Sequence, residues 1–220
     1  MKQMKNQKGF TLVEIAIVLV IIGLLLGGVL KGQELIENGR VKNAATTIHA
    51  IAASYNGYTD RYRKLAGDDG PLATLQARGN NWAAITSAGT NDGIINVADS
   101  PWNTGTAERI AFFQHLRAGG FITGNPADIG GNLLPRNPWG GLVSVSNAAN
   151  QGRATTRILQ VCLSNVPGKA AVALDTQLDD GRPNLGGFRA TQGGENANPA
   201  GAAAAAYSED QLYTICTDIM

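Results

Sequence analysis

The sequence predicts an α+β protein in which one long N-terminal helix precedes a head built on a small antiparallel sheet, and three observations support this. An uninterrupted apolar run extends from Phe10 to Leu30. A helical pattern of apolar residues then continues to about Arg63. Short strand-like segments separated by turns rich in Gly, Asn and Pro occupy the C-terminal half. Helix and strands in separate parts of a chain are typical of the α+β class.

The apolar run is long enough to cross a membrane as a helix. Its twenty-one consecutive residues contain one charged residue, Glu14, and no Pro. At about 1.5 Å per helical residue, a run of this length crosses a hydrocarbon core of roughly 30 Å. We therefore expect a membrane-spanning helix that is surrounded by membrane lipid before any assembly.

The nine residues before the apolar run, MKQMKNQKG, differ from a secretory signal peptide. A secretory signal peptide loses its apolar segment on cleavage, whereas a cut after Gly9 would retain it. The three lysines of the leader keep the N-terminal side in the cytoplasm by the positive-inside rule. The residues after Leu30 are therefore expected outside the inner membrane.

Glu14 is the one carboxylate within the apolar run. A carboxylate in a spanning helix costs about 2.5–3.5 kcal/mol on insertion scales, so a functional role with a cationic partner is the default interpretation. Cleavage after Gly9 would create such a cation, the α-amine of Phe10. The alternative is a Glu14 side chain that reaches the cytoplasmic interface or stays protonated.

The segment GFTLVE at residues 9–14 resembles the cleavage and methylation signal of type IV prepilins and of type II secretion pseudopilins. The resemblance implies that a prepilin peptidase cuts between Gly9 and Phe10 and then methylates the new amine of Phe10. It also implies that Glu14 pairs with the Phe10 amine of a neighbouring subunit. Because that amine is a peptide nitrogen before cleavage, processing would act as an assembly switch.

The same resemblance implies a structural subunit of a type IV pilus or related filament rather than an enzyme. Its expected partners are other pilin subunits, in a homo- or hetero-filament, the prepilin peptidase and an inner-membrane assembly platform. The protein would cross the inner membrane once with its head in the periplasm, and would later lie in an extracellular pilus or a periplasmic pseudopilus. Two alternatives stay open: a pseudopilin of type II secretion, and a minor or tip pilin that acts as an adhesin or binding module.

Beyond Lys31 the pattern changes from uniformly apolar to amphipathic. Small and apolar residues recur at steps of three and four: Val41, Ala44, Ala45, Ile48, Ala52, Tyr55, Tyr58 or Thr59, and Tyr62. This spacing predicts one helix that ends near Arg63 and packs its second half against the head. The alternative is two helices broken at Gly39. If the helix stretches or melts in a filament, we expect this at Gly27-Gly28, where small-residue spacings also permit close helix approach.

The chain is accordingly divided into a leader at 1–9, a membrane-spanning half-helix at 10–30, an amphipathic half-helix at 31–63 and a head at 64–220. In the head we expect a helix from about Thr106 to Ala118, with Thr106 as N-cap and an apolar face of Ile110, Phe113, Leu116 and Phe121. Strands are expected at 142–146, 157–163 and 211–216, and a short helix at 170–178. The low-complexity tract at 192–206 is predicted to be a mobile, solvent-facing loop or a short Ala helix.

Charge and residue content argue against several other functions. The formal charge of +1 becomes −2 without the leader, which holds three of the 18 basic residues against 17 acidic ones in the chain. No basic stripe with interleaved aromatic residues indicates nucleic-acid binding. The two histidines, His49 and His115, provide no metal set and no Ser-His-Asp constellation, so both are interpreted as structural.

The two cysteines, Cys162 and Cys216, lie in strand-like segments that the topology places outside the inner membrane. One disulfide is the simplest outcome in an oxidising compartment, and the pilin resemblance also implies a C-terminal loop closed by a disulfide. Closure of that loop would contribute about 4 kcal/mol in the chain-entropy model. Free thiols or a metal pair are the alternatives.

Three carboxylates close in sequence, Asp175, Asp179 and Asp180, form the best candidate for a cation site, because such groups repel unless solvated, hydrogen-bonded or bound to an ion. The resemblance to pseudopilins suggests calcium as the ion, although the spacing of the pseudopilin ligands is not reproduced here. Two further clusters, Asp68-Asp69-Gly70 and Asn91-Asp92-Gly93, lack a full calcium-loop pattern and are interpreted as turns.

Overall fold

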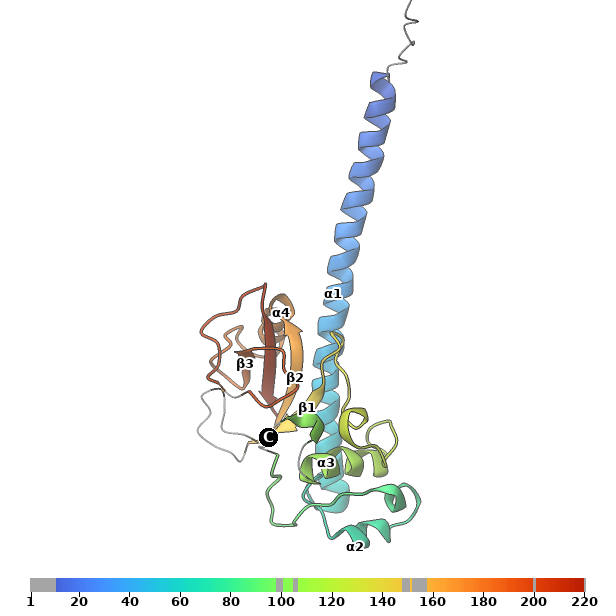
Figure 1. Ribbon diagram of the computed structural model, residues 1–220, viewed down its shortest axis with the longest axis vertical. Helices are drawn as coiled ribbons and strands as arrows, with labels where there is room; N and C mark the ends of the chain where they lie inside the picture. Colours follow the sequence, from blue (N-terminus) through green and yellow to red (C-terminus); the bar gives the residue numbers. More distant parts are fainter. Residues whose placement is uncertain are drawn as a thin grey trace, which may run out of the picture. The chain divides into compact units, whose positions relative to one another are not determined.

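The computed structural model describes residues 11–97, 101–104, 107–147, 151, 158–199 and 201–219 of the chain (Figure 1). The chain divides into two compact units, one ending at Gly39 and the other beginning at Arg40. The leader, Gly9 and Phe10 lie outside the described residues.

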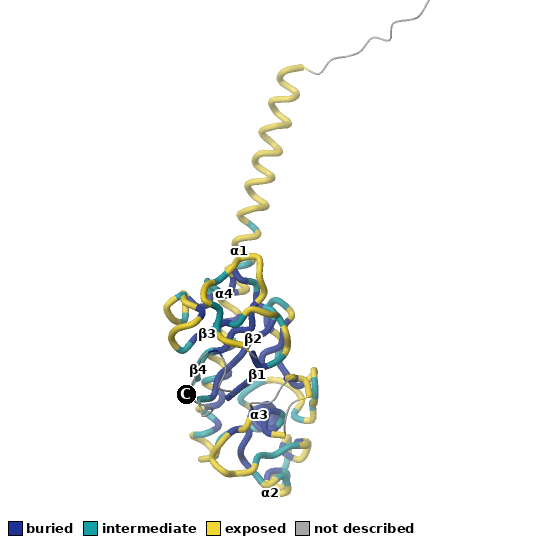
Figure 2. Tube along the Cα trace, turned by 60° about the vertical axis from the view of Figure 1, so that its left-hand side comes forward, coloured by how far each residue is buried: buried dark blue, intermediate teal, exposed yellow. Residues whose placement is uncertain are grey.

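Helix α1, Leu12–Tyr62, is the longest element and continues without a break through Gly39. The expectation of one long helix is therefore confirmed. In the first unit every large apolar side chain from Leu12 to Leu30 is at least 46% exposed (Figure 2). The helix is long and apolar enough to cross a membrane, where its internal hydrogen bonds would satisfy the backbone.

Gly27 and Gly28 lie within the regular part of α1. A Cβ added at either position would meet no described atom within 4 Å. The two glycines thus leave this surface of the helix flat and open to a neighbouring helix. Their expected stretching concerns a filament and stays a prediction.

In the second unit α1 presents one buried face to the head. The buried residues of this face are Val41, Ala44, Ala45, Ile48, Ile51, Ser54, Tyr55 and Tyr58. Six of them were expected from the sequence. Ile51 and Ser54 are buried in addition, whereas the expected Ala52 and Tyr62 are only partly buried. At the aromatic end of this face, Tyr55 stacks on Phe112 and Tyr58 on His115.

Four antiparallel strands form one sheet in the order β1-β2-β4-β3. The strands are β1 Val143–Ser146, β2 Gln160–Pro167, β3 Phe188–Gln192 and β4 Leu212–Asp218. β4 pairs with β2 on one side, where Cys162 lies opposite Cys216, and with β3 on the other. The α+β class and the three strands expected from the sequence are confirmed, whereas β3 was missed. Arg157, the expected start of the second strand, lies outside the described residues.

Several short helices complete the head. They are α2 Leu72–Gln76, α3 Ala107–Ala118 and α4 Gly168–Leu178, together with the 3₁₀ helices η1 Asn80–Ala84, η2 Trp102–Thr104 and η3 Gly130–Asn132. α4 begins two residues earlier than expected. Thr106, the expected N-cap of α3, lies outside the described residues.

Helix α3 is buried on almost every side, which corrects the single apolar face expected for it. Ile110 is only partly buried, whereas the polar residues Arg109 and Gln114 are fully buried. Arg109 donates from Nη2 to the carbonyl of Val97 at 2.6 Å. A buried guanidinium is tolerated because carbonyl oxygens of other segments accept its hydrogen bonds.

The solvent-facing character expected for the tract from residue 192 to 206 is confirmed, because most of its described residues are exposed, whereas the Ala helix is not. Its described residues form no helix. The amide oxygen of Asn198 accepts a hydrogen bond from the indole of Trp102 at 2.7 Å, and the carbonyl of Asn196 accepts one from the backbone N–H of Trp102 at 3.0 Å. The N–H of Ala204 donates to the carbonyl of Ala190 in β3 at 2.8 Å. The two asparagines therefore anchor a tract whose composition suggested mobility.

Candidate functional site

The first turn of α1 contains the only described residues of the predicted cleavage and assembly signal. Its N-terminus is closed by a reciprocal pair of side chains, Thr11 and Glu14. The N–H and the hydroxyl of Thr11 each donate to Oε2 of Glu14 at 2.8 Å. The N–H of Glu14 donates back to Oγ1 of Thr11 at 3.3 Å. This is a capping box, which satisfies two backbone N–H groups that a helix otherwise leaves without an acceptor.

The capping box gives Glu14 a partner within its own chain. This partner was not among those expected for the carboxylate, although a Thr three residues before a Glu at the head of an apolar run is the recognised signature of the box. Both bonds from Thr11 reach Oε2, and Oε1 accepts none from any residue that the structure describes. Glu14 is thus held in place at one oxygen and open to a further donor at the other.

The exposed apolar surface of the first unit continues directly from this cap. It comprises the large apolar side chains between Leu12 and Leu30, with Leu35 and Ile36 beyond them. One ion pair, Lys31–Glu34, follows the apolar segment at 2.8 Å. A surface of this length and polarity requires lipid or apolar helices around it, because exposure to water would cost about 25 cal/mol for each Å².

The family model for the prokaryotic N-terminal methylation motif matches residues 4–30. The chain carries the N-terminal signal of type IV pilins and pseudopilins. This signal, with the apolar helix, supports a pilin-like or pseudopilin filament subunit that a prepilin peptidase processes and that is anchored in a membrane before assembly with other pilins. It points to a structural protein rather than an enzyme. No curated protein matches the chain.

In the head, the expected disulfide joins Cys162 of β2 to Cys216 of β4. Both residues are fully buried at the centre of the sheet. The two cysteines face each other in register, so the bond adds a covalent link to strands that already pair through their backbones. It closes a loop that contains α4 and β3.

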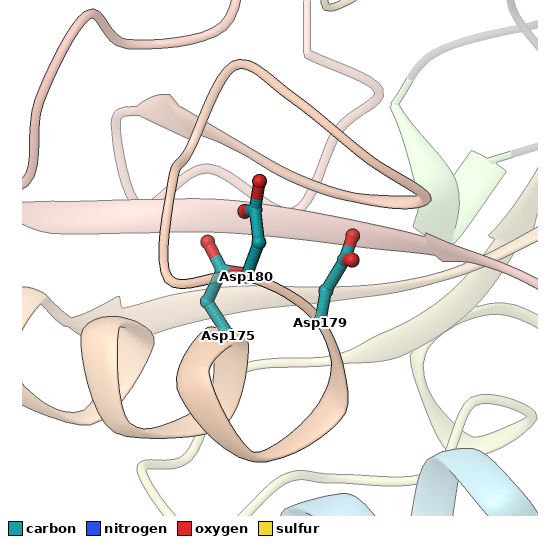
Figure 3. A group of neighbouring side chains, drawn as sticks. All are labelled: Asp175, Asp179 and Asp180. Atoms are coloured by element: carbon teal, nitrogen blue, oxygen red, sulfur yellow. The ribbon is translucent and has the colours of Figure 1, made fainter.

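The acidic residues Asp175, Asp179 and Asp180 come together at the end of α4 and the turn after it (Figure 3). One carboxylate oxygen from each lies within 4.8 Å of the others. Yet each already accepts a hydrogen bond: Asp175 from the Tyr207 hydroxyl at 2.6 Å, Asp179 from the N–H of Phe188 and Asp180 from the N–H of Arg182.

These hydrogen bonds offset part of the repulsion among the three carboxylates. Burial raises the pKa of Asp175, with the neighbouring carboxylates Asp180 and Asp179 acting in the same direction. A raised pKa eases the repulsion that first suggested a cation, because it favours the neutral acid. Calcium at this position stays a prediction.

The two acidic turns noted in the sequence lie side by side and pair with each other. Asp68 accepts hydrogen bonds from the N–H groups of Asp92 at 3.1 Å and Gly93 at 2.9 Å. The adjacent Asp69 accepts the Tyr58 hydroxyl at 2.8 Å and Nη2 of Arg78 at 2.9 Å. The carboxylates thus fasten two loops to each other and to the end of α1, as turn residues rather than as calcium ligands.

His115 is fully buried among these loops, whereas His49 is exposed on α1. Nδ1 of His115 accepts the N–H of Gly67 at 3.2 Å, and Nε2 lies 3.4 Å from the carbonyl of Ser87. The acceptor role of Nδ1 requires a neutral ring with its proton on Nε2. Burial lowers the pKa of His115 to about 4, and Asp69 opposes this shift. The residue is a structural connector between two loops.

Proposed function

We propose that the protein is a subunit of a type IV pilus or related filament, assembled after cleavage between Gly9 and Phe10. The observation that carries this proposal is the capped N-terminus of α1 within the match to the methylation motif. Oε1 of Glu14 is the open acceptor at this end of the helix. It would accept a hydrogen bond from the Phe10 amine of a neighbouring subunit, while Thr11 donates to Oε2.

The apolar surface that follows the cap supports the same proposal. In the bilayer, lipid covers the side chains from Leu12 to Leu30, and in a filament the helices of other subunits would replace lipid with little change in apolar burial. Transfer from membrane to filament then depends on polar and steric matching rather than on hydrophobicity. The Glu14 carboxylate and the glycine surface at Gly27-Gly28 are suited to these two roles.

The experiment compares the intact mass of the protein from membranes and from sheared surface fractions. Wild-type protein is expected to lack Met1–Gly9 and to carry one methyl group. Gly9→Ala should stay uncleaved and remain in the membrane. Glu14→Ala should be cleaved yet absent from the sheared fraction, because the neighbour's amine would lack its acceptor.

Glu34→Ala is the matched control, since it removes a carboxylate from the same helix beyond the apolar segment. It should be cleaved and recovered in the sheared fraction. An uncleaved N-terminus in the wild type would refute the proposal. So would equal recovery of Glu14→Ala and wild type in filaments. Recovery only when a secretion apparatus is overproduced would favour a pseudopilin over a pilus subunit.

A further inference from the structure

An open pocket of about 440 Å³ lies on the head beside the last turn of α1. Its polar and aromatic wall comes from two parts of the chain: Arg61 and Tyr62 at the end of α1, and Arg78, Asn80, Asn81 and Trp82 at η1 and just before it. No described carboxylate lines it. A concave site of this size, with a few convergent polar groups, is large enough for a small ligand.

The two arginines converge on the same aromatic ring. The guanidinium carbon of Arg61 lies 5.3 Å from the ring centre of Tyr62, and that of Arg78 lies 4.8 Å from it. Arg78 also lies 4.6 Å from the ring centre of Trp82. These cation–π contacts fix the direction of both guanidinium groups at the pocket wall. The pocket therefore presents two positive charges in fixed places.

One of the two charges has a carboxylate partner and the other does not. Nη2 of Arg78 is paired with the buried carboxylate of Asp69 at 2.9 Å. Arg61 is exposed and donates one hydrogen bond, from Nη1 to the carbonyl of Gly119 at 3.3 Å. The remaining N–H groups of Arg61 donate to no residue that the structure describes. Both groups are cationic and line the same pocket, so an anion in the pocket would be attracted to them, and most strongly to Arg61, which has no carboxylate partner among the described residues.

The rim of the pocket adds neutral groups that donate and accept hydrogen bonds. Asn80 and Asn81 are both exposed, and each amide has two N–H groups and one oxygen. Asn80 has a φ of 50°, in the left-handed region, where a non-glycine residue is uncommon. This backbone conformation directs the chain around the pocket. The ring of Tyr62 lies under the two guanidinium groups and packs against Tyr58, so the two amides are the neutral groups at the rim.

We propose that this pocket binds an acidic saccharide. The carboxylate of the sugar would lie at Arg61 and Arg78, because a planar guanidinium matches a carboxylate with two parallel hydrogen bonds. The hydroxyl groups of the sugar, which both donate and accept, match the amides of Asn80 and Asn81. A bare phosphate would use the arginines alone.

The test is isothermal titration of the full-length protein in detergent micelles with trigalacturonate, neutral galactotriose and inorganic phosphate. Trigalacturonate should bind, and galactotriose and phosphate should bind at least about tenfold more weakly. Arg61→Gln should weaken trigalacturonate binding about tenfold. Asn81→Ala is a second variant at an exposed position, and should weaken trigalacturonate but leave phosphate unchanged.

Arg63→Gln is the matched control. Arg63 lies two residues after Arg61, carries the same charge and is also exposed, but its side chain lines a different pocket. It should bind within about twofold of wild type. No heat with trigalacturonate at about 10 mM would overturn the proposal. Equal losses in Arg61→Gln and Arg63→Gln would overturn it as well, since they indicate diffuse charge attraction. Phosphate binding as tight as that of trigalacturonate would show a general anion site instead.

This inference is independent of the filament proposal. Arg61→Gln should still lose Met1–Gly9 and still enter the sheared fraction, because Arg61 belongs to the unit that begins at Arg40 and the predicted signal lies in the first unit. Failure of saccharide binding would leave the assembly proposal intact, and failure of assembly would leave the pocket unaffected.

Discussion

Acidification should destabilise the head through His115 from about pH 6.5 downward, which begins well above the pH at which ordinary carboxylates are half protonated. The ring is neutral in the folded protein, where burial lowers its pKa from 6.5 to about 4. In the unfolded chain it binds a proton near pH 6.5, so between these values the unfolded state holds more protons. The contribution of the neutral His115 ring to the stability of the head is therefore fully present above pH 6.5, and it is lost as the pH falls toward 4.

The size of this effect follows from the two pKa values. At about 1.4 kcal/mol for each unit of difference, a decrease from pH 7 to pH 4.5 should remove about 2 to 3 kcal/mol. Part of the loss has a visible cause: protonated Nδ1 can no longer accept the N–H of Gly67, a bond of 3.2 Å between buried groups. For a head of ordinary stability, a loss of about 2 to 3 kcal/mol is a large fraction of the free energy of unfolding.

The free energy of unfolding at each pH can be measured by urea unfolding of the full-length protein in micelles, followed by tryptophan fluorescence. All three tryptophans, Trp82, Trp102 and Trp139, belong to the head, so the signal reports its unfolding. His115→Gln should flatten the pH dependence between 6.5 and 4.5, even if it lowers stability at pH 7. His49→Gln, the same change at an exposed position of α1, should keep the wild-type slope. A His115→Gln variant with an unchanged slope would refute the reasoning.

Two further predictions concern covalent and steric features of the head. Replacement of both cysteines, Cys162→Ala with Cys216→Ala, should lower the free energy of unfolding by about 4 kcal/mol, since their separation of 54 residues sets the loop-closure entropy. In the same urea assay, a loss below about 1 kcal/mol would contradict this estimate. Gly89→Ala should lower stability by about 2 kcal/mol or more, because a Cβ there would overlap the backbone of Asp68. Gly131→Ala, at an open position in η3, is its control and should change the urea midpoint little.

The elements that the sequence predicted best are those specified by local pattern. The apolar run and the three- and four-residue steps in α1 repeat over many turns, so individual exceptions such as Ala52 do not obscure them. The pairing of Cys162 with Cys216 followed from the count of two cysteines and the implied compartment. The capping box at Thr11 and Glu14 is equally local, but it was missed because the prediction for Glu14 used only the charge of that residue.

The elements that escaped prediction depend on partners distant in sequence. β3 is five residues long and is held by pairing with β4, more than twenty residues later. Arg109 is buried because carbonyl oxygens accept its hydrogen bonds, one of them at Val97, and no sequence pattern reveals such acceptors. Asn198 anchors a low-complexity tract through Trp102, which lies 96 residues away. Tertiary contacts of this kind override local composition.

The order of the strands also determines when the head can be completed during synthesis. β4 is the last strand to leave the ribosome, yet it lies in the interior of the sheet, between β2 and β3. Until it emerges, β2 and β3 have no shared partner, and Cys162 has no thiol opposite it. A nascent chain interrupted before Leu212 would thus expose two unpaired strand edges and a reactive thiol, both of which favour aggregation or degradation. The sheet can therefore be completed only in a chain that extends through β4.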